Sequence, residues 1–372
     1  MVSEIAEAPP APAVEAPEAA PAAALVERPA ESTPKSTWIV GPVYDLVFFL
    51  LPPIMASLAG YYITGHVVDT EEFDFYGFEV TPANLFLGVF IHAHIIAVVF
   101  RSHANKTVLK RFPMRFLALP VLLYMALVSS IWCLIIASVL ATFWDVYHSG
   151  AQTFGFARIY DAKQGNARDA GRRLDWWLNQ ILYAGPIIGG MTMMAHFESF
   201  SEFDEVGPIF FTKIPAFMES WQSYFTWAIV IGSVAYLIYY VKSYIRLARE
   251  GHKISKQKVF LLVTTNACTI WAWGFNPWGQ AFFIVNVFHA LQYFGLVWWS
   301  EKKTMMQTFG VEANRFGKPI ALLMFVSLTC LYGLFVESSD ASITTLWAIT
   351  LTASLMHFYY DGFIWSVRKQ HI

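Results

Sequence analysis

Residues 116–157 read FLALPVLLYMALVSSIWCLIIASVLATFWDVYHSGAQTFGFA, and Asp145 is their single charged residue. A run of about 18 apolar residues is enough to form one transmembrane helix. This stretch is too long for one such helix, yet it is short for two helices with a loop between them. It therefore predicts two closely joined spans, near 114–131 and 133–157, in a protein that lies in a membrane.

The composition of the whole chain agrees with a membrane protein. Hydrophobic residues make up 56% of the 372 residues and charged residues only 14%, whereas about 25% of a soluble domain is charged. Further apolar runs predict spans near 41–63, 82–100, 176–196, 222–244, 257–275, 278–300, 317–337 and 341–366. We therefore expect an all-α, polytopic bundle of about ten transmembrane helices, surrounded by membrane lipid.

The distribution of charge predicts how these helices are oriented. If the amino terminus is inside, all of the 25 basic residues except Lys213 fall in cytoplasmic segments. The loops on the other side are acidic, as in Asp69-Thr-Glu-Glu-Phe-Asp74. Basic residues are enriched in cytoplasmic loops. We therefore predict a multi-pass protein of the bacterial inner (cytoplasmic) membrane with both termini in the cytoplasm.

The first 36 residues differ from the rest of the chain. They are rich in Ala, Pro and Glu and poor in aromatic residues, so they cannot bury enough surface to fold. They also lack the basic start and apolar centre of a signal peptide. We predict a disordered cytoplasmic tail over 1–36, either passive or a tether for a protein partner, followed by a transmembrane domain over 37–372.

Several kinds of chemistry find no support in the sequence. Cys133, Cys268 and Cys330 stand alone in apolar runs without CxxC spacing, so neither a disulfide framework nor a thiolate metal site is predicted. GxxxxGK[ST], HExxH and GxSxG motifs are all absent. We also expect no nucleic-acid partner.

Four histidines share one predicted depth in the membrane. His92, His148, His289 and His357 lie on the second, fourth, eighth and tenth predicted spans, and each precedes the next cytoplasmic basic residue by nine to thirteen positions. At 1.5 Å per residue, these separations are about 14–20 Å. Four helices could thus deliver their imidazoles to one site in the cytoplasmic half of the membrane. His94 is the alternative to His92, because residues two apart point about 200° away from each other around a helix.

Polar residues accompany three of these histidines on the same helical face. They are Asp145 and Gln152 beside His148, Gln292 beside His289, and Asp361 beside His357. Neutral histidine is a good ligand for iron, zinc or copper, and its second nitrogen usually needs a carboxylate or carbonyl partner. Ionisable groups inside a membrane are costly and are therefore candidates for function. The other interpretation is that each histidine only forms hydrogen bonds between helices.

Aromatic residues surround two of the histidine motifs. The segments His289-Ala-Leu-Gln-Tyr-Phe-Gly-Leu-Val-Trp298 and His357-Phe-Tyr-Tyr-Asp-Gly-Phe-Ile-Trp365 show this pattern. Such rings either line a tunnel for a long apolar substrate or face lipid and the helix bundle.

These motifs resemble the Brp/Blh family of membrane β-carotene 15,15′-dioxygenases, which carries short histidine motifs on separate membrane helices. Tyr147-His-Ser-Gly150, Phe288-His-Ala-Leu-Gln-Tyr-Phe294 with Trp298, and His357-x-x-x-Asp361 are similar to three of them. The family's opening Pro-His-Gly-x-x-Asp motif is replaced here by Ile91-His-Ala-His94, Tyr293 stands where the family has a second histidine, and more spans are predicted. The similarity covers about a tenth of the chain.

These observations lead to the hypothesis of a non-haem Fe(II), O2-dependent enzyme acting on a carotenoid, isoprenoid or other lipid. His92 or His94 would bind the iron with His148, His289 and His357, and the four polar neighbours would orient the imidazoles or transfer protons. The alternatives are a lipid desaturase or hydroxylase, a haem-binding electron-transfer subunit, and a transporter with a relay of His and Asp residues. The desaturase is disfavoured because the chain lacks HxxxH and HxxHH boxes.

Overall fold

The computed structural model describes residues 36–63, 71–190, 192–198, 203, 207, 212–339 and 343–365. The chain divides into two units, Met1–Lys35 and Ser36–Ile372. All of the described residues belong to the second unit. The predicted tail over 1–36 therefore lies outside the described residues, apart from Ser36.

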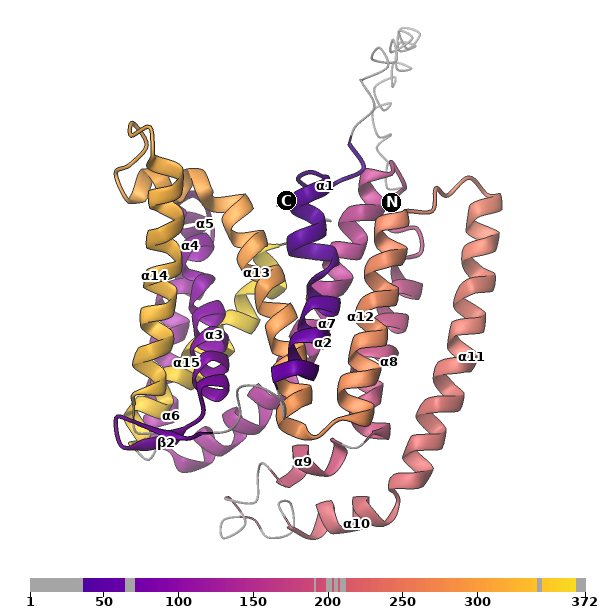
Figure 1. Ribbon diagram of the computed structural model, residues 1–372, viewed down its shortest axis with the longest axis horizontal. Coiled ribbons are helices and arrows are strands. Elements are labelled where there is room, and N and C mark those ends of the chain that lie inside the picture. The colour runs from indigo at the N-terminus through magenta and orange to yellow at the C-terminus, as the bar shows by residue number, and fades with distance from the viewer. Residues whose placement is uncertain are drawn as a thin grey trace, which may run out of the picture. The chain divides into compact units, whose positions relative to one another are not determined.

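The described residues form helices joined by short connections, with one small hairpin (Figure 1). The elements up to the first long helix are α1 (Pro42–Asp45), the π-helix η1 (Leu46–Leu50), α2 (Pro52–Ile63), β1 (Phe73–Phe75), β2 (Phe78–Val80), α3 (Pro82–Ala97), α4 (Val99–Ser102), α5 (Lys106–Arg111), the π-helix η2 (Met114–Ala118), α6 (Leu119–Ser129) and α7 (Ile131–Lys163). The remainder are α8 (Arg172–Gly189), α9 (Met193–Glu198), α10 (Ile214–Ser220), α11 (Gln222–Arg249), α12 (Lys256–Phe275), α13 (Trp278–Thr308), α14 (Gly317–Glu337) and α15 (Thr344–Ile364). The expected all-α class is confirmed.

The hairpin joins two strands that pair in antiparallel fashion, with Phe75 opposite Phe78. Its turn residues, Tyr76 and Gly77, have φ values of 56° and 89°. Positive φ at both central positions belongs to a tight two-residue hairpin turn.

Five helical segments among the described residues are long and apolar enough to cross a membrane: Pro82–Ser102, Ile131–Lys163, Gln222–Arg249, Trp278–Thr308 and Gly317–Glu337. The pair Pro42–Leu50 and Pro52–Tyr62, bent by 48°, would be a sixth if it forms one span. The structure thus shows a membrane protein, but the prediction of ten spans exceeds this count. The other predicted ranges do contain helices, which are shorter or carry more polar residues, as α15 does with His357 and Asp361.

The long apolar stretch that predicted two joined spans is divided at one residue. Ser130 is extended, with φ −150° and ψ 122°, and its side chain accepts a hydrogen bond from the backbone N–H of Cys133. A serine in this conformation satisfies one of the free N–H groups at a helix start. The stretch therefore becomes Met114–Ser129, formed by η2 and α6, followed directly by the long helix α7.

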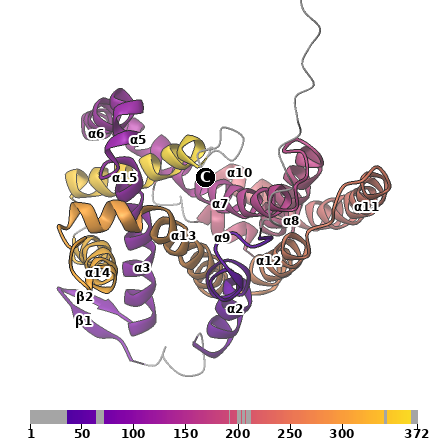
Figure 2. The ribbon, with the colours of Figure 1, turned by 90° about the horizontal axis from the view of Figure 1, so that it is seen from above.

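Helix α13 lies at the centre of the described unit and α11 at its edge (Figure 2). In the most apolar part of α13, 78% of the residues are buried, whereas none are buried in that of α11. Helix α13 packs against α2, α3, α12 and α14, and α11 packs mainly against α8. Most residues in the apolar part of α13 are consequently covered by other helices.

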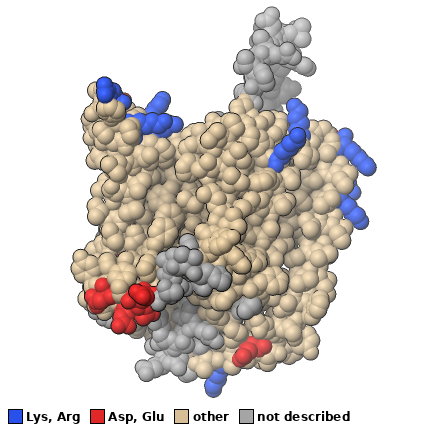
Figure 3. Space-filling view, in the orientation of Figure 1, with Lys and Arg blue, Asp and Glu red and all other residues tan. Residues whose placement is uncertain are grey.

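On one face of this unit, exposed basic and acidic side chains gather at opposite ends. On the face seen in Figure 3, Lys and Arg gather at the upper end, whereas Asp and Glu lie near the lower end with a single basic residue. This is the arrangement that basic and acidic connections take on the two sides of a membrane bundle.

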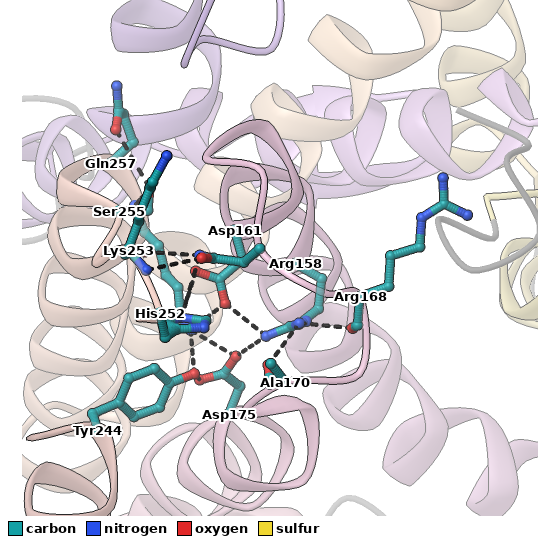
Figure 4. Close-up of polar contacts among 12 residues, drawn as sticks. Arg158, Asp161, Arg168, Ala170, Asp175, Tyr244, His252, Lys253, Ser255 and Gln257 are labelled. Carbon is teal, nitrogen blue, oxygen red and sulfur yellow. Dashed lines mark hydrogen bonds and ion pairs between the residues drawn. The ribbon is translucent and has the colours of Figure 1, made fainter. Parts of the chain in front are cut away.

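Two of the basic residues are buried in an ionic network instead of lying at the surface (Figure 4). One Asp175 carboxylate oxygen accepts hydrogen bonds from Arg158 at 2.6 Å and from Lys258 at 2.7 Å. One Asp161 oxygen accepts from the same two cations at 2.7 and 2.8 Å. All four side chains are at most 3% exposed. We call Arg158, Asp161, Asp175 and Lys258 the charge cluster.

Tyrosine hydroxyls and backbone carbonyls add further hydrogen bonds to the charge cluster. The hydroxyls of Tyr240 and Tyr244 donate to the other Asp175 oxygen at 2.9 and 2.7 Å. Arg158 also donates to the backbone carbonyls of Arg168 and Ala170. These bonds connect α7, α8, α11 and α12, so the charge cluster joins four helices at the basic end of the unit.

Candidate metal centre

Four helices each bring one histidine to a common point in the interior of the unit. His94 lies on α3, His148 on α7, His289 on α13 and His357 on α15. Their exposed fractions are 1%, 5%, 0% and 0%. We call these four residues the histidine cluster. Since their helices are far apart in the sequence, the cluster exists only through the packing of the bundle.

The four imidazoles form a closed ring of contacts. The ring centroid of His94 lies 5.1 Å from the centroids of His289 and His357. The ring centroid of His148 lies 5.1 Å from that of His289 and 4.7 Å from that of His357. His94, His289 and His357 can each offer a nitrogen so that all three atoms lie within 4.8 Å of one another. The donors therefore converge on one small volume.

Two of the nitrogens approach much more closely. The Nε2 atoms of His148 and His357 are 3.0 Å apart. This distance suits a hydrogen bond in which one ring donates its N–H to the other. It also suits two ligands of one ion, because nitrogens about 2.1 Å from a metal and at right angles to each other lie about 3.0 Å apart.

Several nitrogens of the histidine cluster make no hydrogen bond with the described residues. They are both ring nitrogens of His94, both of His289, and Nδ1 of His357. Buried polar atoms usually have a hydrogen-bond partner, and a neutral imidazole nitrogen with a free lone pair is a common metal ligand. The donor set therefore fits a metal ion that prefers nitrogen, such as iron, zinc or copper.

One carboxylate belongs to the same site. Asp361 Oδ2 lies 3.7 Å from His148 Nε2 and 3.8 Å from His357 Nε2. Its Oδ1 accepts hydrogen bonds from the Tyr293 hydroxyl and from the Trp365 indole N–H, both at 2.9 Å. The two donors hold one oxygen in place while the other faces the imidazoles, where its negative charge would offset that of a cation.

Tyr293 and Trp365 were not predicted as site residues. Each lies four positions after a residue that was predicted, Tyr293 after His289 and Trp365 after Asp361. Residues four apart share a helical face, so this spacing was a usable signal in the sequence. The missing information was that Tyr293 on α13 meets Asp361 on α15.

Gln152 and Gln292 support the site from one side without facing the imidazoles. The Gln152 amide donates to the backbone carbonyl of His289 at 3.1 Å and to the Gln292 side-chain oxygen at 3.2 Å. The Gln292 amide donates to the backbone carbonyl of Phe49 at 2.9 Å. These bonds fix α13 against α7 and η1, and hence the position of His289.

Asp145 and His92 are not brought into the site. Asp145 is only partly buried and makes no hydrogen bond or ion pair with a described residue. His92 points its Nδ1 toward Glu337 on α14, 3.0 Å from the carboxylate, and toward the backbone carbonyl of Gly88 at 2.9 Å. Of the two histidines on α3, it is His94 that joins the others.

A cavity of about 850 Å³ adjoins the histidine cluster at His148 and Asp361. It follows α7 from Trp144 to Ile159, a length of about 22 Å at 1.5 Å per residue. Aromatic side chains dominate its wall: Trp144, Tyr147, Phe154, Phe156, Trp176, Tyr293, Phe358, Tyr359, Phe363 and Trp365. A cavity of 300–1,000 Å³ with such a wall can bury a mostly apolar ligand.

Comparison of the chain with protein-family models, with curated proteins and with solved structures found no match. The resemblance to the Brp/Blh family therefore rests on the three short motifs alone. The histidine cluster and its cavity are therefore the basis for a proposed function.

Proposed function

We propose that the chain is a metal-dependent oxidoreductase of the bacterial inner membrane that uses O2 to oxidise a lipophilic substrate. The observation that carries this proposal is the histidine cluster, because its buried imidazoles converge from four helices and leave nitrogens without hydrogen-bond partners among the described residues. Stabilising a bundle does not require such an arrangement. Buried polar groups without partners weaken a fold.

Iron is the ion that suits this proposal best. The imidazoles are neutral ligands of the kind found around Fe(II), Zn(II) and Cu, and Asp361 adds one nearby negative charge. Iron, when bound, would supply the redox chemistry with O2 that no side chain of the cluster provides. His94, His148, His289 and His357 would hold it.

The residues around the histidine cluster would then have separate tasks. Tyr293 and Trp365 hold Asp361 in one orientation, and Asp361 can accept a proton from His148 or His357. The aromatic wall of the cavity would hold a carotenoid, an isoprenoid or another lipid beside His148 and keep water away. Excluding water protects reactive intermediates from side reactions.

The contacts among the imidazoles favour a single ion over haem. Each of the four rings contacts two of the others, and two of their nitrogens are 3.0 Å apart, so a macrocycle would have to separate them. An optical spectrum of the purified protein distinguishes the two cofactors, since haem gives a Soret band. A Soret band together with an equal amount of haem and iron would contradict the oxygenase and favour an electron-transfer function.

The metal site is tested by elemental analysis of the detergent-purified protein. We expect about one iron per chain, and we expect His289→Ala to lose it because this variant removes a central ligand. The control is His92→Ala, which alters the same kind of residue outside the histidine cluster and should keep the iron. Native protein without stoichiometric metal, or equal iron in the two variants, contradicts the proposal.

We also propose that the protein crosses the membrane ten times with both ends in the cytoplasm. The segregation of basic and acidic side chains supports this (Figure 3). The turns at Glu250 and Asn276, on either side of α12, should then lie on opposite sides of the membrane. A reporter enzyme that is active only outside the cytoplasm should work when inserted at Asn276 and fail at Glu250. Activity at both sites, or at Glu250 alone, contradicts this topology.

A further inference from the structure

Two arginines in the wall of the cavity have no role in the metal centre or in the charge cluster. Arg115 lies in η2 and Arg172 at the start of α8, and both line the cavity. Neither forms an ion pair with a carboxylate of the described residues. The third arginine of the wall, Arg158, differs because Asp161 and Asp175 already neutralise it.

Aromatic rings support both arginines within the cavity wall. The Arg115 guanidinium lies 4.9 Å from the ring centre of Phe363, and that of Arg172 lies 5.1 Å from the ring centre of Phe154. A guanidinium that stacks on a ring still has its N–H groups free at the edge, where they can bind an oxyanion through two bonds at once. The stacking therefore prepares both groups for an anion.

The charges in the wall are distributed unevenly along the cavity. Asp361 is the only carboxylate among the lining residues, and it lies beside the imidazoles with hydrogen bonds from Tyr293 and Trp365. Along α7, Arg158 is ten residues beyond His148, which is about 15 Å. The cavity wall thus combines three arginines, of which Arg158 is already paired with carboxylates, with aromatic residues and with His148 and Asp361 of the metal centre.

We propose that the cavity binds a single-chain lipid with an anionic head, in which the head is a phosphate or carboxylate held by Arg115 and Arg172. The apolar chain runs along the aromatic wall toward His148 and Asp361. The idea that the chain is then oxidised rests on the proposed function, whereas the binding of the head does not. A lipid of this kind satisfies both features of the cavity, because its head neutralises the arginines and its chain covers the rings.

The test is a binding measurement with three probes that share one chain: hexadecyl phosphate, palmitate and hexadecanol. The protein is held in phosphatidylcholine nanodiscs, and binding to empty discs is subtracted. We expect at least one of the anions to bind about tenfold or more tightly than the alcohol, since a charged hydrogen-bonded pair contributes this much. Comparison of phosphate with carboxylate identifies the head. Equal binding of all three probes would overturn the proposal.

Two double variants locate the anion. Arg115→Gln/Arg172→Gln removes the two arginines of the cavity wall that form no ion pair with described residues, of which Arg115 is exposed and Arg172 partly buried. Arg111→Gln/Arg173→Gln removes two exposed neighbours that do not line the cavity. Both lose the same net charge. We expect the first to bind the anionic probe about tenfold more weakly and the second to bind it as the native protein does. Equal effects of the two variants would show general surface attraction and overturn the proposal.

Native protein provides the check if the first variant does not fold. Rising salt should weaken hexadecyl phosphate binding and leave hexadecanol binding unchanged. Inorganic phosphate alone should compete poorly with the bound lipid probe because it has no apolar chain. Competition as strong as that of hexadecyl phosphate would overturn the proposal that the ligand is a lipid. Iron analysis of the same samples separates the two proposals: anion binding without iron counts against the enzyme, and iron without anion selectivity counts against the lipid.

Discussion

Helix α7 contributes to both the histidine cluster and the charge cluster. His148 belongs to the first, and Arg158, ten residues further along, belongs to the second. In the charge cluster, two cations face two carboxylates, and tyrosine hydroxyls and backbone carbonyls add further hydrogen bonds. Among the described residues, Arg158 Nε and Asp161 Oδ1 are the atoms of this cluster that have no hydrogen-bond partner. In the histidine cluster, several ring nitrogens have no hydrogen-bond partner among the described residues. The charges of the charge cluster are thus neutralised by side chains of the same chain, whereas the histidine cluster presents the ring nitrogens that would bind the ion we propose.

The largest expected effect comes from unbalancing the charge cluster. Asp175→Ala leaves Arg158 and Lys258 with only Asp161 between them, and breaking a buried ion pair costs about 3–5 kcal/mol. We therefore expect a large fall in thermal stability, measured by the fraction of monodisperse protein after heating. Asp169→Ala, an exposed aspartate of the neighbouring turn, is the control. Equal stability of the two variants would show that the charge cluster contributes little to the fold.

The histidine cluster should respond to an ion in a way that the charge cluster does not. An ion that binds only the folded protein adds about 2.7 kcal/mol to the free energy of unfolding when it is present at about a hundred times its Kd. Chelation should therefore lower the melting temperature of the native protein. His289→Ala, which lacks a ligand, should melt at the same temperature with and without chelator. A native protein insensitive to chelation contradicts this expectation.

A smaller effect is expected from the hydroxyl that holds Asp361. Tyr293→Phe removes one of the two hydrogen bonds to Asp361 Oδ1, and losing such a supporting bond typically weakens metal binding by about 10–100-fold. Competition with a chelator of known affinity measures this change. Tyr332→Phe is the matched control, because the Tyr332 hydroxyl is buried and has no hydrogen-bond partner among the described residues. A Tyr293→Phe protein with native affinity would show that the hydrogen bond from Tyr293 to Asp361 does not contribute to metal binding.

The smallest effect should come from the ion pair of His92, the histidine of α3 that lies outside the histidine cluster. Glu337→Gln removes the negative partner of His92, and a partly exposed ion pair contributes about 1 kcal/mol or less. We expect a small change in thermal stability and no change in iron content. Loss of iron from this variant would mean that His92, and not only His94, supports the site.

The choice between His92 and His94 shows where sequence reasoning stops. Hydropathy and charge indicate the depth of a residue in the membrane, and on that basis His92 is slightly the better candidate. Joining the histidine cluster depends instead on how α3 is rotated against α13 and α15. That rotation is determined by tertiary packing, and the sequence of α3 alone does not predict it. His148, His289 and His357 were less ambiguous because each stands alone on its helix.

The basic residues illustrate the same limit. The sequence predicted the segregation of Lys and Arg to one side because loop charges follow a simple rule. It did not distinguish Arg158 and Lys258, which are buried, from exposed Arg173. Lys258 and Asp175 are 83 positions apart, and only the packing of α12 against α8 brings them together. The helices could thus be predicted from local composition, whereas the partners of their buried side chains could not.

The separation of His94 and His357 along the chain also determines when the histidine cluster can form during biosynthesis. His94 lies on α3 and His357 on α15, the last helix of the described chain. Three of the four imidazoles are synthesised before α15, and the fourth is part of it. The complete histidine cluster can therefore form only after α15 has inserted and packed against the other helices. A chain that stalls or is cut before α15 cannot assemble all four ligands, however well its earlier helices fold.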